Sequence, residues 1–184
     1  MKAKWLGLAL VSAAVAAGCG EGRAIFNVDV YSFLKGTGRD TVPYLVPPGL
    51  SGSGSSTPQK INLPGAGSSI VDSVRALGTI DLINATGSGS LGLQVFLAAD
   101  SAGTYNPAAL AITVPTKNVS PATTTPDTIR GDLSAALDTL FTKSQLWIRF
   151  GASGSNPLPS VTPLQGKAAL KSLLLTVIIK DKFF

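Results

Sequence analysis

Apolar residues alternate with polar ones in several short runs of this 184-residue chain, and proline and glycine stand between the runs. An alternation of period two puts every second side chain on one face, as in a half-buried β-strand. We therefore expect strands at about 26–30, 76–84, 90–98, 110–114, 145–150 and 173–179. The last run is apolar on both faces, which is typical of a central strand that is covered on both sides.

Short antiparallel strands separated by turn residues are typical of an all-β sandwich. An immunoglobulin-like sandwich and a jelly-roll both fit this pattern, and a small barrel is the alternative. The segments 76–84 and 90–98 are joined by a Thr-Gly-Ser-Gly sequence, so we expect them to pair as a hairpin.

One short crossing helix is expected at about 132–143. Thr125 or Asp127 would cap its N-terminus, with Pro126 near the first turn. Its apolar residues recur at helical spacing and would face the core; they are Leu133, Ala136, Leu137, Leu140 and Phe141.

The segment from about 42 to 67 holds five prolines and a Gly/Ser-rich stretch over 49–56. Such a composition buries little apolar surface. We therefore expect one long flexible loop there, inside a single β-sandwich domain that covers residues 25–184.

The N-terminal segment has the pattern of an export signal. Lys2 and Lys4 precede an uncharged run over 5–17 that is rich in Leu, Ala and Val, and small residues follow it. A helix that spans a bilayer needs about twenty apolar residues, so this run is too short to be one.

The residues that follow, Ala16-Ala17-Gly18-Cys19, resemble the lipobox of bacterial lipoproteins. The resemblance implies a signal peptide over 1–18, cleavage after Gly18 and a diacylglyceryl group on the sulfur of Cys19, usually with an acyl chain on the new N-terminus. Residues 19–24 would then be a tether. Gly20 and Glu21 resemble an outer-membrane address, so the expected location is the bacterial cell envelope, at the outer membrane.

The alternative is ordinary secretion, with Ala14-Val15-Ala16 as the cleavage site and Cys19 as a free thiol. Cys19 is the only cysteine in the chain, and it stands where the lipobox needs it. A lone thiol is a liability in an oxidising compartment, so the lipobox is the better interpretation.

The composition excludes several kinds of site. With no His, the chain has no Ser-His-Asp or Cys-His pair and no His metal ligand. A single Cys allows neither an intrachain disulfide nor a CxxC pair. The net charge of +5 is not clustered, which disfavours nucleic acid as a partner. We expect no enzymatic activity, no catalytic residues, no cofactor and no metal site.

Three short motif matches lack the context that their chemistry needs. Residues 87–92 fit G-x-G-x-x-G, but an alternating strand follows where a dinucleotide site has a helix. Residues 32–35 fit S-x-x-K without S-D-N or K-T-G, inside a run that alternates as a strand. Residues 100–106 have oxygen donors like a calcium loop but one carboxylate, so we expect an Asx-type turn.

Trp147 is the one candidate ligand contact. It stands between Gln145 and Arg149 on the polar side of its strand, where the ring could stack on a sugar or a partner. The alternative is that the helix or a loop covers the ring.

The favoured function is a lipid-anchored, non-catalytic module with a structural or binding role. One alternative is a surface-fibre subunit that assembles by strand addition through residues 171–184 or 24–34. Another is a carbohydrate-binding protein or an accessory to a carboxylate-only hydrolase. The expected partners are the membrane, through the lipid anchor, and a protein or a glycan.

Overall fold

The computed structural model describes residues 22–63, 70–107, 109–134 and 140–181. One antiparallel sheet contains β1 (Gly22–Asp29), β2 (Thr41–Val46), β5 (Ile70–Thr86), β8 (Thr123–Asp132) and β10 (Leu164–Asp181). The other contains β3 (Ser51–Ser55), β4 (Gln59–Asn62), β6 (Gly89–Ala98), β7 (Leu110–Val119) and β9 (Gln145–Ser155). We call them the β10 sheet and the β9 sheet. Within the described residues, the strands are interrupted by the short helices α1 (Val30–Leu34) and η1 (Ala102–Tyr105), the second of which is a 3₁₀ helix.

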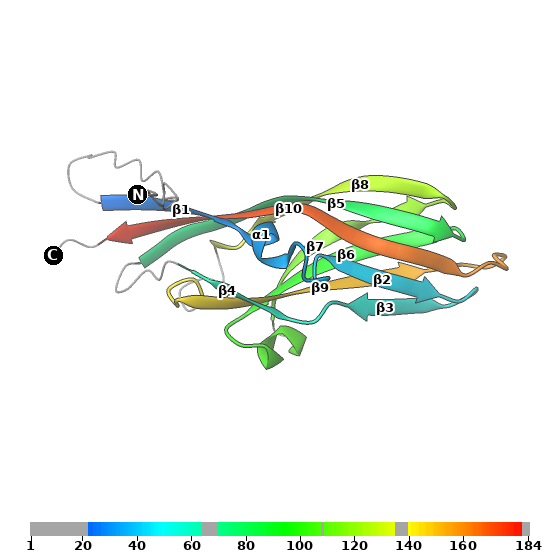
Figure 1. Cartoon of the computed structure of the whole chain (residues 1–184), viewed down its shortest axis with the longest axis horizontal. Coiled ribbons are helices and arrows are strands. Elements are labelled where there is room, and N and C mark those ends of the chain that lie inside the picture. The colour runs from blue at the N-terminus through cyan, green and yellow to red at the C-terminus, as the bar shows by residue number, and fades with distance from the viewer. Residues whose placement is uncertain (1–21, 64–69, 108, 135–139, 182–184) are drawn as a thin grey trace, which may run out of the picture.

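The two sheets pack face to face as a jelly-roll sandwich (Figure 1). The strand order is β1–β10–β5–β8 in one sheet and β3–β9–β6–β7 in the other, with β2 also on β10 and β4 also on β9. If each interrupted edge, β1/β2 and β3/β4, counts as one strand, the eight strands are ordered 1-8-3-6 and 2-7-4-5. This is the jelly-roll order. It differs from the ABED and CFG sheets of an immunoglobulin fold.

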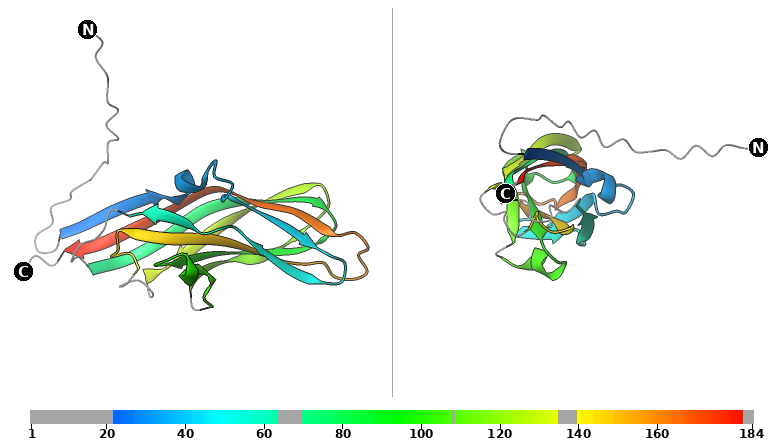
Figure 2. Two further views of the ribbon diagram at one scale, coloured as in Figure 1. Left: turned by 60° about the horizontal axis from the view of Figure 1, so that its bottom comes forward. Right: turned by 90° about the vertical axis from the view of Figure 1, so that its left-hand side faces the viewer.

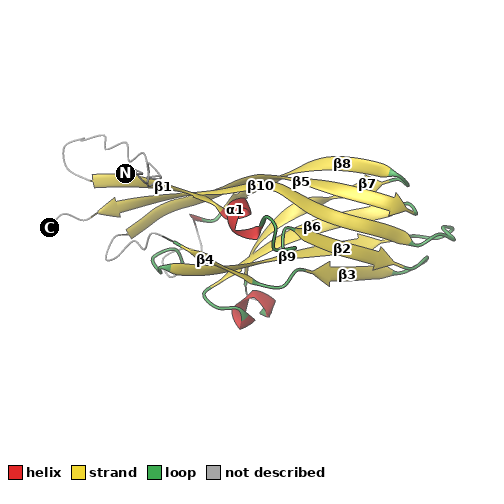
Figure 3. Cartoon of the chain, in the orientation of Figure 1, coloured by secondary structure: helices red, strands yellow, loops and turns green. Residues whose placement is uncertain are grey.

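The sandwich is elongated, and strands make up most of the described chain (Figure 3). The start of β1 and the end of β10 lie at one end of it, because Gly22 pairs with Asp181. β3 lies toward the opposite end (Figures 1 and 2). Among the residues described, no helix has the length and apolar character needed to cross a bilayer.

The expected hairpin between 76–84 and 90–98 is wrong. Both segments are strands, but β5 belongs to the β10 sheet and β6 to the β9 sheet. The turn between them crosses from one sheet to the other. Gly87 adopts a positive φ of 70° there, and the Asn84 amide donates a 2.8 Å hydrogen bond to its carbonyl. The Gly-Ser sequence thus marks a turn but does not determine whether the flanking strands pair.

Three strands, β2, β3 and β4, lie in the segment 42–67 that we expected to be one flexible loop; residues 64–67 lie outside those described. Val42, Tyr44 and Val46 of β2 are buried on alternate positions, as in any half-buried strand. β3 has only Ser and Gly, yet it pairs with β9 along its whole length. Its glycines allow close backbone packing, since a Cβ added at Gly54 would lie 2.8 Å from the Pro43 carbonyl oxygen.

The helix expected at 132–143 falls partly on residues 135–139, which are outside those described. Asp132 ends β8, and residues 140–144 form a turn followed by a bend. The proposed cap is wrong, because Thr125, Pro126 and Asp127 lie inside β8.

Prolines occur inside three edge strands rather than only between strands: Pro43 in β2, Pro115 in β7 and Pro126 in β8. An edge strand has one side without a neighbour, where a missing backbone N–H costs no ladder hydrogen bond. Proline on that side also hinders pairing with another chain.

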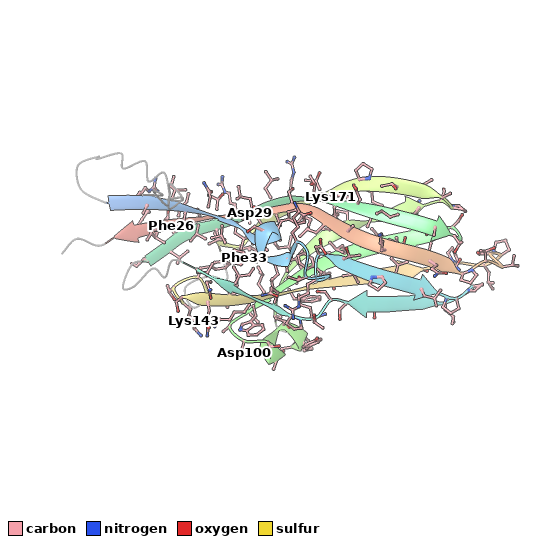
Figure 4. The ribbon with its side chains drawn as sticks, viewed as in Figure 1. Phe26, Asp29, Phe33, Asp100, Lys143 and Lys171 are labelled. Atoms are coloured by element: carbon pink, nitrogen blue, oxygen red, sulfur yellow. The ribbon has the colours of Figure 1, made fainter. Side chains whose placement is uncertain are left out.

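The domain begins earlier than residue 25, because β1 pairs with β10 from Gly22 onward. The expected tether over 19–24 is therefore too long. The strand expected at about 26–30, and the longer extended segment 24–34 considered for strand addition, both stop at Asp29. The Asp29 carboxylate caps α1 by accepting a hydrogen bond from the Ser32 amide at 3.3 Å. Figure 4 shows Asp29 beside this helix.

One core fills the space between the sheets. β10 is central in its sheet, as expected for 173–179, but only its inner face is covered: Leu173 and Leu175 are buried, whereas Leu174 is 39% exposed. An ion pair of 3.1 Å between Lys117 of β7 and Asp127 of β8 links the two sheets at one edge. The largest fully buried side chains are Leu34, Ile61, Ile80, Leu91, Leu93, Leu97, Ile129, Leu146, Ile148, Leu164, Leu173 and Leu175.

Candidate functional site

The outer face of the β9 sheet carries small hydroxyl side chains on adjacent strands. The register places Ser53 of β3 opposite Ser153 of β9, and Ser153 opposite Gly92 of β6. The next row along consists of Ser51, Ser155 and Ser90. Alternate residues of a strand point to opposite faces, so these serines project away from the core.

Two adjoining hollows lie on this face, with volumes of about 480 and 320 Å³. Both are lined by Ser53 and Ser153, so they form one continuous depression. We call it the β9 groove and define it by Ser51, Ser53, Ser90, Gly92, Gln94, Phe96, Thr116, Arg149, Gly151, Ser153 and Ser155.

The hydroxyl and amide groups along the groove are not used inside the protein. Within the described ranges, the side chains of Ser53, Gln94, Thr116 and Ser153 form no hydrogen bond. Serine and threonine hydroxyls both donate and accept, and the glutamine amide does the same through its two ends. These groups therefore remain available to water or to a polar ligand.

Arg149 of β9 lines the smaller of the two hollows, the one of about 320 Å³. It is a buried cation, only 8% exposed. Its Nε and Nη2 donate hydrogen bonds of 3.1 and 2.7 Å to the carbonyl oxygen of Thr104. The guanidinium carbon lies 4.1 Å from the centre of the Phe96 ring and 4.4 Å from that of Tyr105, which are cation–π distances.

No carboxylate in the described part of the chain forms an ion pair with Arg149. Burial lowers the pKa of the Arg149 guanidinium from its ordinary value, and the nearby Tyr105 acts in the opposite direction. An arginine in a protein nonetheless stays protonated near neutral pH. The site therefore contains a positive charge that no anion among the described residues balances directly.

η1 holds the acceptor of Arg149 in place. The Asx-type turn expected at 100–106 is confirmed, because the Asp100 carboxylate accepts a 2.7 Å hydrogen bond from the Gly103 amide. The Thr104 hydroxyl donates a 2.7 Å hydrogen bond to the Ser101 carbonyl, and its side chain is fully buried. Figure 4 shows Asp100 at this helix, which projects from the body of the sandwich.

Trp147, the ligand contact predicted from the sequence, is half-buried and lines neither hollow. It lies two residues before Arg149, opposite Lys60 of β4 and Ala98 of β6. Cys19 and Gly18 lie outside the described residues.

Sequence reasoning placed Arg149 on the polar side of its strand but assigned it no role. The high content of Ser and Gly at 51–55, 88–92 and 151–155 was the available signal for the groove.

Three aspartates outside the groove, Asp72, Asp81 and Asp127, form ion pairs. Asp72 lies 2.8 Å from Lys180 and 3.1 Å from Arg23, and the hydrogen bond from Lys180 holds its pKa below the ordinary value. Asp81 lies 3.3 Å from Lys171. In the ranges that the structure describes, no group of three or more His, Cys, Asp and Glu side chains is arranged to hold a metal ion.

No protein-family model matches the sequence, and no curated protein matches it. Among solved structures, the chain is similar to one of the infectious bursal disease virus Gt strain, with a TM-score of 0.40, 9% identity and coverage of 98% of this chain and 42% of that chain. A structure of the Gx strain of the same virus has a TM-score of 0.38 and 12% identity, with coverage of 88% of this chain and 33% of that chain. A structure of T=1 particles derived from infectious bursal virus has a TM-score of 0.39 and 9% identity, with coverage of 99% of this chain and 40% of that chain. The chain thus spans less than half of each viral chain, and a likeness at this level says nothing about its function.

Proposed function

We propose that this protein is a lipid-anchored component of a bacterial cell envelope, and that its jelly-roll domain is a non-catalytic module that binds a partner. The proposal rests on the lipobox-like sequence Ala16-Ala17-Gly18-Cys19 and on the short spacing between its cysteine and the sandwich. Cys19 stands three residues before Gly22, the first residue of β1. Three peptide steps span at most about 11 Å, so an anchor at Cys19 would hold that end of the sandwich at the membrane surface.

The position of the β9 groove supports a binding role. β1 begins at one end of the sandwich, whereas β3, which lines the groove, lies toward the other end (Figures 1 and 2). An anchor beside β1 would therefore leave the groove away from the bilayer. Two or three long acyl chains give stable attachment, since each buried CH₂ contributes about 0.8 kcal/mol.

Assembly into a fibre by strand addition has less support. Residues 171–181 of β10 are paired on both sides, with β1 and with β5 over most of their length, and residues 24–29 are paired with β10. Either segment would first have to leave its own sheet. The edge strands β2, β7 and β8 each contain a proline, which disfavours the addition of a neighbouring strand.

Fractionation of cells that carry Cys19→Ser tests the anchor. The unchanged protein should be found in the membrane fraction, and the variant should lose lipid labelling and accumulate as the unprocessed precursor. Ser12→Ala, within the same apolar run, is the matched control and should behave as the unchanged protein. Cys19→Ser protein that is processed and sedimented like the unchanged protein would refute the proposal.

A further inference from the structure

We infer that the β9 groove binds a carboxylate-bearing sugar chain, with Arg149 as the receptor for the carboxylate. This inference rests on the binding role proposed above and not on the lipid anchor. Its starting point is the buried guanidinium of Arg149, which has no carboxylate partner within the described residues.

The guanidinium has donors left for a ligand. An arginine carries five N–H donors in a planar fork, and Arg149 uses two nitrogens, Nε and Nη2, on the Thr104 carbonyl. Nη1 has no hydrogen-bond partner among the described residues. The Nη1–Nη2 edge of the fork matches the two oxygens of a carboxylate.

Gly151 keeps space open beside that edge. A Cβ added at Gly151 would lie 2.9 Å from the Phe96 ring and 3.8 Å from Nη1 of Arg149. A side chain at this position would therefore displace the ring that stacks on the guanidinium and would narrow the approach to it. Glycine allows a ligand group to come close to the strand backbone at this point.

The rest of the groove is suited to hydroxyl groups. Ser53, Ser153 and Gln94 offer donors and acceptors that the described protein does not use, and neighbouring strands repeat them at about 4.8 Å. None of the side chains that line the groove is acidic, so nothing there repels a carboxylate. A sugar acid chain offers the same combination, many neutral hydroxyls with one carboxylate on each unit.

Other ligand classes fit this surface less well. A neutral sugar chain would leave the buried charge of Arg149 unbalanced. A nucleic acid would present bases, which bind by stacking on aromatic rings. Phe96 is the one aromatic ring among the residues that line the groove, and Arg149 already stacks on it.

Binding of the purified protein to oligogalacturonate, measured by isothermal titration calorimetry, tests the inference. Two matched probes separate its parts: fully methyl-esterified oligogalacturonate keeps the sugar chain and removes the charge, and polyglutamate keeps the charge without the sugar. We expect binding to oligogalacturonate and at least about a tenfold weaker affinity for each of the other two. Equal binding of the methyl ester would refute the role of Arg149, and equal binding of polyglutamate would refute the sugar.

Variants locate the site. Arg149→Lys keeps the charge but loses the fork, and we expect it to weaken oligogalacturonate binding about tenfold. Gln94→Ala combined with Ser153→Ala changes only exposed side chains and should also weaken it several-fold. The control is Thr124→Ala, on an exposed position of β8 in the other sheet, which should bind like the unchanged protein.

No binding of oligogalacturonate, or binding that the Gln94→Ala/Ser153→Ala variant leaves intact, would overturn the inference. Because both of these side chains are exposed, their loss should not prevent folding, and an unchanged melting temperature would confirm that. Cys19→Ser should bind as well as the unchanged protein. A negative binding result would therefore leave the anchor proposal standing, and a negative fractionation result would leave the groove untouched.

Discussion

The Arg149 guanidinium donates two hydrogen bonds to a single acceptor, the carbonyl oxygen of Thr104, through Nε at 3.1 Å and Nη2 at 2.7 Å. This contact joins β9 to η1, a helix inserted in the chain between β6 and β7. It fixes the plane of the guanidinium between the rings of Phe96 and Tyr105. A charged side chain thus holds a loop of its own chain and lines the groove at the same time.

Replacing Arg149 with alanine should loosen η1. The change removes both hydrogen bonds and two ring contacts, and we expect it to lower the free energy of unfolding by about 2–3 kcal/mol. Hydrogen exchange should become faster over residues 101–106, while the central strands keep their protection. Arg130→Ala, at an exposed position of β8, is the control and should change stability by less than about 0.5 kcal/mol. Unchanged exchange over 101–106 would show that Arg149 does not hold the loop.

Tyr44 should make the protein less stable in alkali. The buried hydroxyl donates to the Ile83 carbonyl at 3.1 Å, and burial raises the pKa of Tyr44 from 10.0 to about 12. Because the folded protein holds this proton more tightly than the unfolded chain, the contribution is complete below pH 10. It is lost as the pH rises from 10 to 12, by up to about 2–3 kcal/mol.

Urea denaturation at several pH values above 9 measures this effect. Tyr44→Phe should have a shallower loss of stability over pH 10–12 than the unchanged protein, although it is less stable at neutral pH. The exposed Tyr105 serves as the control through Tyr105→Phe, which should keep the full alkaline loss. The same slope in Tyr44→Phe and in the unchanged protein would contradict the assignment.

Gly166 of β10 should not tolerate a side chain. A Cβ added there would overlap the Ile83 carbonyl oxygen and the Tyr44 hydroxyl. We expect Gly166→Ala to lower the free energy of unfolding by about 2 kcal/mol or more, because two strands and a buried ring would have to move. At Gly52 the nearest atom to an added Cβ is a Val46 methyl at 3.4 Å, an ordinary contact. Gly52→Ala should therefore cost less than about 1 kcal/mol, and equal effects of the two changes would refute the packing argument.

The sequence predicted the class of fold because alternation reports directly on burial. Leu146, Ile148 and Phe150 alternate with polar neighbours, and all three are buried in β9. The alternation does not predict which strands pair with each other, because strand pairing depends on contacts between residues far apart in the chain. β5 and β6 are adjacent in sequence, yet their partners lie in different sheets.

β3 shows a second limit of sequence patterns. Its Ser-Gly alternation contains no apolar side chain, so a hydrophobic pattern cannot identify it as a strand. Pairing with β9 and close approach to β2 make it one.

The site was partly predictable. The alternation around Trp147 placed Gln145, Trp147 and Arg149 on the side of the strand away from the core, and Trp147 was the natural candidate for a ligand contact. The importance of Arg149 comes from η1, which supplies the Thr104 carbonyl, and from Phe96 on a neighbouring strand. The sequence around Arg149 does not predict either contact, because both partners come from segments far away in the chain.

Mass spectrometry of the N-terminal peptide of the mature protein, isolated from the cells that make it, tests the central claim of a lipid anchor. We predict a chain that begins at Cys19 and carries a diacylglyceryl group on its sulfur. A chain that begins elsewhere, or one in which Cys19 has an unmodified thiol, would contradict it.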